Sequence, residues 1–452
     1  TQDIENIKAV TKEDILRVYE TYIKDKPFVL TSFVPKGQLD LAAKNSVMAA
    51  VVEEEIKENL DVEVIERNNE VIKTPSNFDR SIEPGQGVSP KLNIPESWSA
   101  TTANQMKVLG VEQTELPLVN FSLIIDGGHM LDSFDKNGVA NLMTDIMMEG
   151  TANRTPQELE EAIELLGASI NMRTGNEAIT ISGNTLVRNF RETMDLVEEI
   201  LLNPRWDEEE LKRIKLSTIN SIKRSSANPN VVSRNVRNKV LYGEKHMLAY
   251  PISGSVTSVE AITMNDLKSF YENYFSPSVS RFHIVGNIDK EEVLTVLEDL
   301  ESKWAVKEVS IPTYPLPEKR DKASLYFVDI PNAKQSVIDI GYLSMARTDS
   351  DFFAATVMNY KLGGSFSGNV NLILREEKGY TYGARTGFSG TKTPGTFSAS
   401  SSVRTNTTYE SVQIFKEEIE KYKNGITQED LDFTKNALIK SNARRFESQY
   451  SL

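Results

Sequence analysis

One stretch of the chain spaces three polar residues as a metal-binding helix would. In GVANLMTDIMMEGTANRT, residues 138–155, Asn141, Thr144 and Asp145 stand at positions i, i+3 and i+4. Residues at this spacing share one helix face, where two imidazoles could converge on a zinc ion and a glutamate could reach its bound water. An amide, a hydroxyl and a single carboxylate are a poor zinc ligand set. We therefore expect this helix to hold no metal.

The composition excludes several functional classes. The 452 residues include 51 Lys and Arg against 65 Asp and Glu, a formal net charge of −14. Nucleic acid and anionic membrane surfaces require clustered positive charge, so neither is an expected partner. The chain has no cysteine, which excludes disulfides and thiolate ligands, and its three histidines, His129, His246 and His283, lie far apart. No apolar run approaches the roughly 18 residues that span a bilayer.

Two segments of the chain share a pattern that predicts the same local structure. VTKEDILRVYETYIKDKPFVLTSFVPKG, from Val10, and ITMNDLKSFYENYFSPSVSRFHIVGNI, from Ile262, match at an offset of 252 residues. Each opens with a capping box, Thr11 to Asp14 or Thr263 to Asp266, and each predicts a helix followed by a short apolar strand. We interpret residues 1–37 as the closing tail of a preceding domain, so that the chain begins and ends inside a longer protein.

Hydrophobic periodicity predicts an α+β fold built of two similar modules. The expected boundaries are a tail at 1–37, a connector at 38–105 with a helix over 38–59, modules at 106–302 and 324–452, and a linker at 303–323. The expected strands are 118–126, 168–173, 177–184, 324–330, 336–343, 381–388 and 395–403. The expected helices are 138–149, 155–166, 188–202, 207–225, 230–241, 289–302, 350–362, 368–377, 407–424 and 427–445.

The chain resembles the pitrilysin/insulinase family of zinc peptidases. The resemblance rests on GVANLMTDIMMEGT, on the two closing tails and on LGGSFSGNVNLILREEKGYTYG from Leu362. It implies homologous modules, each a mostly antiparallel sheet covered by helices, paired into one half of a clam-shell. Two such halves would face each other around a closed chamber that admits peptides or unfolded segments.

The resemblance also implies that the zinc belongs to another half. In a catalytic half the first helix carries H-x-x-E-H, whose positions are occupied here by Asn141, Thr144 and Asp145. A glutamate ligand would follow on the helix expected at 207–225 or just beyond, yet no Asp or Glu occurs from Leu211 to Gly243. We expect no cofactor in this chain and one zinc in a homologous partner half, on the same polypeptide or on a separate subunit.

The second module resembles the family's zinc-free halves at LREEKGYTYG. There the resemblance implies that Arg375 binds a substrate carbonyl and that Tyr382, seven residues on, donates to the developing oxyanion. It also suggests that Gly363, Gly364 and Ser365 touch the incoming peptide. The alternative for these glycines is a helix C-cap and turn that requires positive φ.

Taken with the resemblance, the sequence predicts the zinc-free half of a two-half metallopeptidase, inactive alone. The alternatives are a non-catalytic structural subunit of the same fold, and a clamp that binds peptide without hydrolysing it. A periplasmic location is an expectation from the resemblance only.

Overall fold

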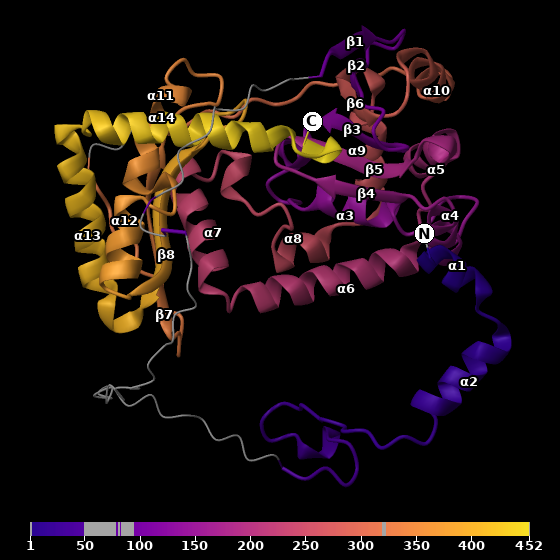
Figure 1. Ribbon diagram of the computed structural model, residues 1–452, viewed down its shortest axis with the longest axis horizontal. Helices are drawn as coiled ribbons and strands as arrows, with labels where there is room; N and C mark the ends of the chain where they lie inside the picture. Colours follow the sequence, from indigo (N-terminus) through magenta and orange to yellow (C-terminus); the bar gives the residue numbers. More distant parts are fainter. Residues whose placement is uncertain (1, 49–77, 80–81, 83–94, 319–321, 452) are drawn as a thin grey trace. The chain divides into compact units, whose positions relative to one another are not determined.

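The chain forms two compact units in the computed structural model, which describes residues 2–48, 78, 79, 82, 95–318 and 322–451 (Figure 1). The first unit runs from Thr1 to Gly85 and the second from Gln86 to Leu452. Among the described residues, no helix is long and apolar enough to cross a membrane.

The first unit contains the helices α1 (Gln2–Ala9) and α2 (Lys12–Tyr22) and a 3-10 turn at Leu39–Leu41, and none of its described residues is buried. The capping box predicted for α2 is confirmed, because Asp14 N donates to Thr11 Oγ1 while Thr11 N donates to Asp14 Oδ2. The apolar strand predicted to follow α2 is wrong for this copy, since residues 28–34 have no strand assignment. Of the helix expected at 38–59, residues 49–59 lie outside the described residues, and residues 38–48 form only the 3-10 turn.

The larger part of the second unit is built on a six-stranded sheet of order β1-β2-β6-β3-β5-β4, in which only β2 and β6 run parallel. The strands are β1 (Ser97–Thr101), β2 (Lys107–Glu112), β3 (Leu118–Asp126), β4 (Ser169–Thr174), β5 (Ala178–Leu186) and β6 (Ser280–Gly286). The edge strand β1 lies within the range that the sequence assigned to a connector. Its residues Ser97 to Thr101 pair with Val111 to Lys107, so the sheet begins before residue 105.

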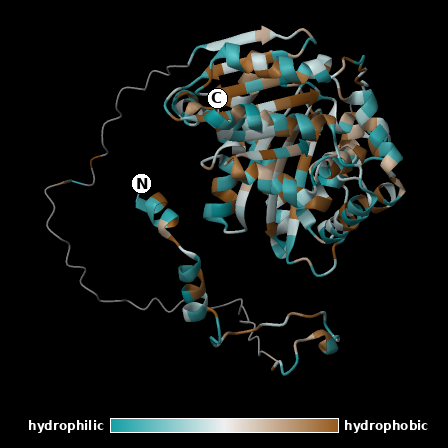
Figure 2. Cartoon of the chain, turned by 90° about the vertical axis from the view of Figure 1, so that its right-hand side faces the viewer, coloured by the Kyte–Doolittle hydropathy of each residue, from teal (hydrophilic) through white to brown (hydrophobic). Residues whose placement is uncertain are grey.

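Helices connect the strands of this sheet along the chain and pack against it. They are α3 (Val139–Met147), α4 (Pro156–Leu165), α5 (Phe190–Leu202), α6 (Glu208–Ser225), α7 (Pro229–Tyr242), α8 (Val256–Ala261), α9 (Met264–Tyr274) and α10 (Lys290–Lys303). Alternate residues of β3, from Val119 to Ile125, are buried in the core with α3, while those between them are partly exposed. Figure 2 shows the hydrophobic residues alternating with polar ones along the strands. The helix and the strand predicted in the repeat from Ile262 are confirmed as α9 and β6.

The rest of the second unit carries a three-stranded antiparallel sheet of order β7-β9-β8. Its strands are β7 (Gln335–Leu343), β8 (Thr381–Ser389) and β9 (Thr396–Arg404), and its helices are α11 (Phe352–Asn359), α12 (Asn369–Asn371), α13 (Thr408–Lys421) and α14 (Gln428–Asn442). The helices α11 and α12 each continue as a π-helical turn, at Tyr360–Gly364 and at Leu372–Glu377. The strand predicted at 324–330 is wrong: these residues have no strand assignment, and Leu325 and Phe327 are exposed.

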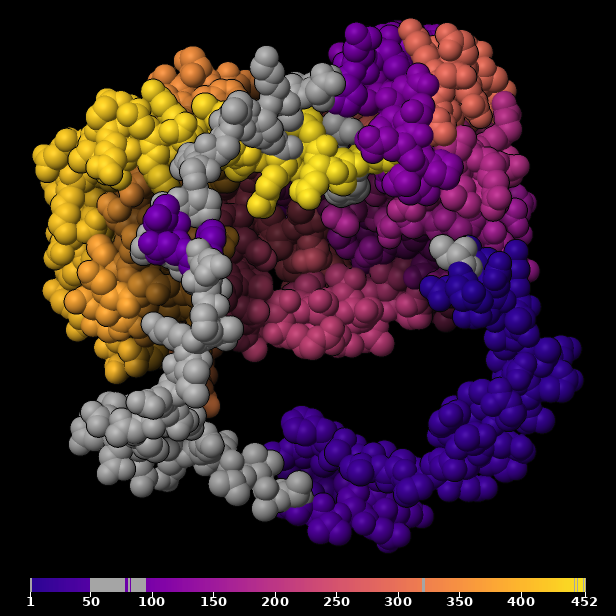
Figure 3. Space-filling model, in the orientation of Figure 1, coloured from indigo at the N-terminus to yellow at the C-terminus, as the bar shows by residue number. Residues whose placement is uncertain are grey.

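Each sheet packs on a hydrophobic cluster of its own. Polar contacts join the two parts of the unit. The helix α7 lies between the sheets and contacts β7 (Figure 1), where Arg237 Nη1 is 2.8 Å from Asp339 Oδ2. A second contact lies near the C-terminus, yellow in Figure 3, where Asn120 Nδ2 donates to Gln449 Oε1 over 3.1 Å. Because both clusters belong to one compact unit, the boundary at 303–323 stays a prediction.

Candidate functional site

The helix α3 places the three polar residues as the sequence predicted. It begins after Gly138, whose φ of +106° favours glycine, and Asp132 caps it by accepting from Gly138 N at 2.7 Å and from Ala140 N at 2.9 Å. Asn141 Nδ2 then donates to Asp145 Oδ2 over 3.0 Å. Thr144 is buried and its hydroxyl donates to Asn141 O at 2.9 Å. Asn141 and Asp145 therefore bind each other on one face of α3.

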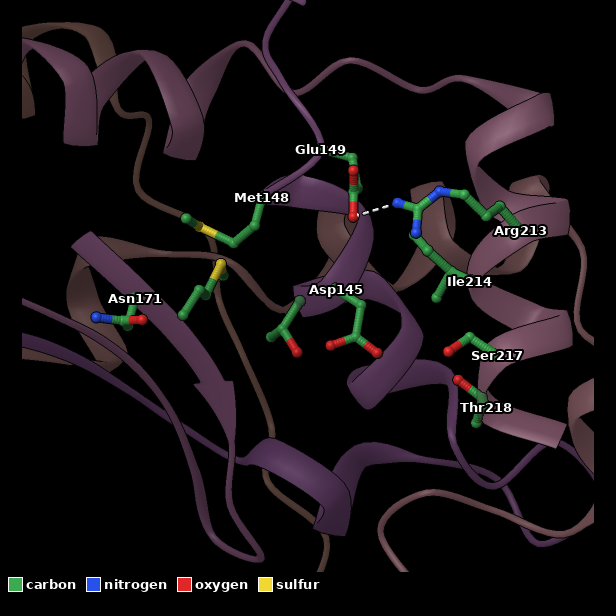
Figure 4. Close-up of a pocket in the computed structure, with 10 residues that line it drawn as sticks. Asp145, Met148, Glu149, Asn171, Arg213, Ile214, Ser217 and Thr218 are labelled. Atoms are coloured by element: carbon green, nitrogen blue, oxygen red, sulfur yellow. Dashed lines mark ion pairs between the residues drawn. The ribbon is translucent and has the colours of Figure 1, made fainter. Parts of the chain in front are cut away.

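An open pocket of about 390 Å³ lies against this face of α3 (Figure 4). Its walls come from α3, from β4 and from α6, so the structure brings α6 to the place where a third ligand was expected. The residues that line it are Thr144, Asp145, Met148, Glu149, Asn171, Met172, Arg213, Ile214, Ser217 and Thr218. Ser217 and Thr218 lie on the α6 wall, and Figure 4 shows their hydroxyls turned toward Asp145.

The charged groups around this pocket differ in whether an ion pair neutralises them. Arg213 Nη2 lies 2.5 Å from Glu149 Oε1, and its Nε lies 2.7 Å from Glu210 Oε2, so its guanidinium is shared between two carboxylates. Asp145 is left with the neutral amide of Asn141. Burial, and then the negative charge of Glu149, raise the pKa of Asp145 to about 6.

The residues at these positions do not fit a zinc ion. Asp145 is the single carboxylate among the three motif positions, and α6 adds hydroxyls where zinc needs an anionic or imidazole ligand. The histidines serve elsewhere: His129 is fully buried and bonds Asp132 through Nδ1 at 3.0 Å, His246 is buried, and His283 lies on β6. Within the part of the chain that the structure describes, no three His, Asp or Glu residues gather as a metal site.

The other candidate residues lie in the second module. Arg375 lies in the π-helical turn Leu372–Glu377, and its guanidinium carbon lies 4.6 Å from the ring centroid of Phe366. Its Nε is also 3.2 Å from Glu376 Oε1. The side chain keeps 38% of its surface exposed. Stacking on an aromatic face leaves the edge of a guanidinium free to bind an oxygen acceptor.

Tyr382 lies in a β-bulge of β8. Thr381 pairs with Val403 and Ala384 with Ser401, so three steps along β8 match two along β9. Thr381 Oγ1, which donates to Ser402 O at 2.7 Å and accepts from Gly383 N at 3.0 Å, holds the bulge. The Tyr382 side chain is 90% exposed. Bulges often re-aim a side chain beside an active site, and this one presents a phenol to solvent.

In the glycine-rich turn, glycine is required because neighbouring atoms leave no room for a Cβ, and not because the backbone has a positive φ. A Cβ on Gly363 would lie 2.6 Å from Val370 Cγ2, and one on Gly364 would lie 2.6 Å from Asn359 Nδ2. Neither glycine has positive φ, so the alternative that assigned them to such a turn is wrong. Ser365 Oγ donates to Tyr360 O over 3.1 Å and is partly exposed. The sequence reasoning also missed Phe366, whose ring carries Arg375, because an exposed aromatic in a turn has no distinguishing pattern.

Two family models match most of the chain. The model described as insulinase (peptidase family M16) matches residues 107–254, and the model described as peptidase M16 inactive domain matches residues 261–438. The boundary between the two matches falls just before α9. The candidate residues Arg375 and Tyr382 lie in the inactive-domain match, and the α3 pocket lies in the other.

Individual relatives agree with these models. An uncharacterized zinc protease, YmxG of Bacillus subtilis, is 22% identical over 62% of this chain and 68% of its own length. A non-peptidase homolog, YmxG of Helicobacter pylori, is 24% identical over 76% of this chain and 80% of its own length. The crystal structure of a peptidase M16 inactive domain from Pseudomonas fluorescens superposes with a TM-score of 0.71 at 26% identity, covering 76% of this chain and 83% of that one. The chain spans about two thirds of the zinc-protease relatives it matches. These matches confirm the predicted α+β fold and the resemblance, and the chain belongs to the insulinase family of peptidases, family M16.

Proposed function

We propose that this chain is the zinc-free half of a two-half metallopeptidase and supplies substrate-binding and oxyanion-stabilising groups to the zinc-bearing half. The observation that carries the proposal is the pair formed by a stacked, half-exposed Arg375 and a bulge-mounted, exposed Tyr382. The positions on α3 that would hold zinc in a catalytic half carry residues that do not fit it. The two findings together support a peptidase in which one half binds zinc and this half binds the substrate.

The proposed chemistry assigns one role to each side chain. Zinc held by the partner half would supply the activated water of peptide hydrolysis. Arg375 holds the substrate by donating from its guanidinium to a peptide carbonyl near the scissile bond. Tyr382 donates its hydroxyl hydrogen to the oxygen on which negative charge develops, and such a donor favours the transition state over the bound substrate. Gly364 and Ser365 would face the incoming peptide, whereas Gly363 is buried and only supports this turn.

The first unit supports a partner of the same fold. At the offset of 252 residues, Ile15 of α2 corresponds to Leu267 of α9, and Leu30 corresponds to Phe282 of β6. Leu267 and Phe282 are fully buried, whereas Ile15 and Leu30 are 64% and 68% exposed. A segment that repeats the apolar pattern of a core element is expected to bury it in an equivalent core. We infer that residues 11–34 pack into a homologous module of the zinc-bearing half.

The alternative function is a non-catalytic structural subunit. It is favoured by the likeness to the non-peptidase homolog of Helicobacter pylori, which extends over more of this chain than the likeness to the Bacillus zinc protease. A structural subunit would need the fold and the partner contact without Arg375 or Tyr382. The periplasmic location expected from the resemblance stays a prediction.

The test is a reconstitution of this chain with its zinc-bearing half. Arg375→Lys keeps a positive charge but loses the planar guanidinium, and we expect kcat/KM for peptide hydrolysis to fall by about tenfold or more. The zinc content of the assembly should not change. An unchanged kcat/KM would refute the role of Arg375. An assembly that contains no zinc and hydrolyses no peptide would establish the structural alternative.

A further inference from the structure

Asn371 forms hydrogen bonds with both segments that support the two groups on which the proposed function depends. It is the last residue of α12, directly before the π-helical turn that carries Arg375, and its side chain is only 3% exposed. A buried side-chain amide requires partners for both its oxygen and its nitrogen. Asn371 finds them in two different segments of the second module.

The first partner is the turn that supports Arg375. Asn371 Nδ2 donates to the backbone oxygen of Phe366 over 2.7 Å. The Phe366 ring is the surface on which the guanidinium of Arg375 rests. The amide therefore fixes the backbone from which that ring projects.

The second partner is the bulge that carries Tyr382. Asn371 Oδ1 accepts from the backbone N–H of Ala384 over 3.0 Å. Ala384 is the first residue of β8 to regain register with β9 after the bulge. The same side chain thus holds the strand two residues beyond Tyr382.

We infer that Asn371 is a positioning residue that sets the placement of Arg375 relative to Tyr382, an inference that rests on the proposed function of those two residues. Its carboxamide joins the turn under Arg375 to the strand behind Tyr382 through two hydrogen bonds of opposite sense. Apolar side chains of similar size can fill the same space but can make neither bond. An aspartate can accept from Ala384 N–H but cannot, when ionised, donate to Phe366 O.

The first measurement is amide hydrogen exchange of the 452-residue chain itself. Asn371→Ala should speed exchange at Ala384 by about tenfold, because its N–H loses a buried acceptor. Asn371→Asp should leave exchange at Ala384 close to that of the parent chain while it loosens residues 365–368. Unchanged exchange at Ala384 in Asn371→Ala would overturn the inference.

The second measurement separates positioning from general stability. Thr386→Val serves as the matched control, because the Thr386 hydroxyl donates to Asn359 Oδ1 over 2.6 Å and is buried on the same strand. In the assembly with the zinc-bearing half, Asn371→Ala should lower kcat/KM about 100-fold through both a lower kcat and a higher KM, whereas Thr386→Val should stay within about threefold. Equal losses in both variants would show a merely structural role and overturn the inference.

A parallel Tyr382→Phe variant separates a failure of the proposed function from a failure of the positioning role of Asn371. If Tyr382→Phe does not slow hydrolysis, the proposed function fails, although the exchange result still reports on the two hydrogen bonds. If Tyr382→Phe slows hydrolysis and Asn371→Ala does not, the proposed function stands and the positioning role of Asn371 is wrong.

Discussion

Replacing Asp145 by asparagine should stabilise the first module at neutral pH. The folded chain raises the pKa of Asp145 from 3.8 to about 6 through burial and the charge of Glu149. A carboxyl with a raised pKa binds its proton more tightly in the folded state. Its favourable contribution is therefore complete below about pH 4 and is lost as pH rises through about 6. A shift of this size corresponds to about 3 kcal/mol at pH 7.5.

The Asp145→Asn variant isolates this effect, because asparagine has nearly the same shape, cannot ionise and keeps an oxygen that can accept from Asn141 Nδ2. Urea unfolding can be followed by tryptophan fluorescence, since Trp98, Trp206 and Trp304 are the three tryptophans of the chain and all lie in or beside the first module. The difference in unfolding free energy between the variant and the parent should be near zero at pH 4 and approach about 3 kcal/mol at pH 7.5.

A matched control separates this local effect from net charge. Asp135→Asn removes the same charge from an exposed position outside the pocket. The reasoning would be refuted if Asp145→Asn were no more stable than the parent chain at pH 7.5. It would also be refuted if the difference were the same at pH 4 and at pH 7.5.

Three further predictions concern packing, capping and association. Gly363→Ala should destabilise the second module by about 1–3 kcal/mol in urea unfolding, because its Cβ would meet Val370 and Thr386, and an unchanged midpoint would contradict this. Thr155→Ala should cost the first module about 1 kcal/mol by removing the N-cap of α4, a loss that tryptophan fluorescence would detect or exclude. Leu30→Asp should weaken association with the zinc-bearing half in sedimentation while leaving urea unfolding unchanged; equal association would argue against docking through residues 11–34.

Local patterns predicted those elements whose stabilising contacts are close in sequence or strictly periodic. The strand β3 has the predicted bounds, because the alternation of apolar residues from Leu118 to Asp126 matches the alternation of buried positions. The box that opens α4 is confirmed, since Thr155 and Glu158 satisfy each other's backbone N–H groups within one turn. The α+β class follows from such elements.

Tertiary pairing decided the segments that the sequence reading assigned wrongly. Residues 28–34 and 280–286 have similar apolar patterns, yet only the second copy finds neighbouring strands, β2 and β3, and becomes a strand. The segment 324–330 likewise has no strand assignment. A strand depends on hydrogen bonds to a distant segment, which its own residues cannot specify.

The candidate site could be predicted only in part for the same reason. The spacing on α3 located Asn141 and Asp145, whereas the hydroxyls that α6 contributes to the pocket were not predicted. Neither the bulge at Tyr382 nor the bond from Ala384 N–H to Asn371 Oδ1 has a local signature, because both depend on how β8 registers against β9.

The central claim is that this chain contributes Tyr382 to a site whose zinc lies in the partner half. The most direct test is the kcat of peptide hydrolysis by the reconstituted assembly after Tyr382→Phe, which removes one hydroxyl. Tyr380→Phe is the control, because Tyr380 lies two residues earlier and packs against the hydrophobic cluster of the second module. We predict that Tyr382→Phe lowers kcat about 100-fold at unchanged zinc content while Tyr380→Phe does not. Undiminished hydrolysis in Tyr382→Phe would contradict the claim.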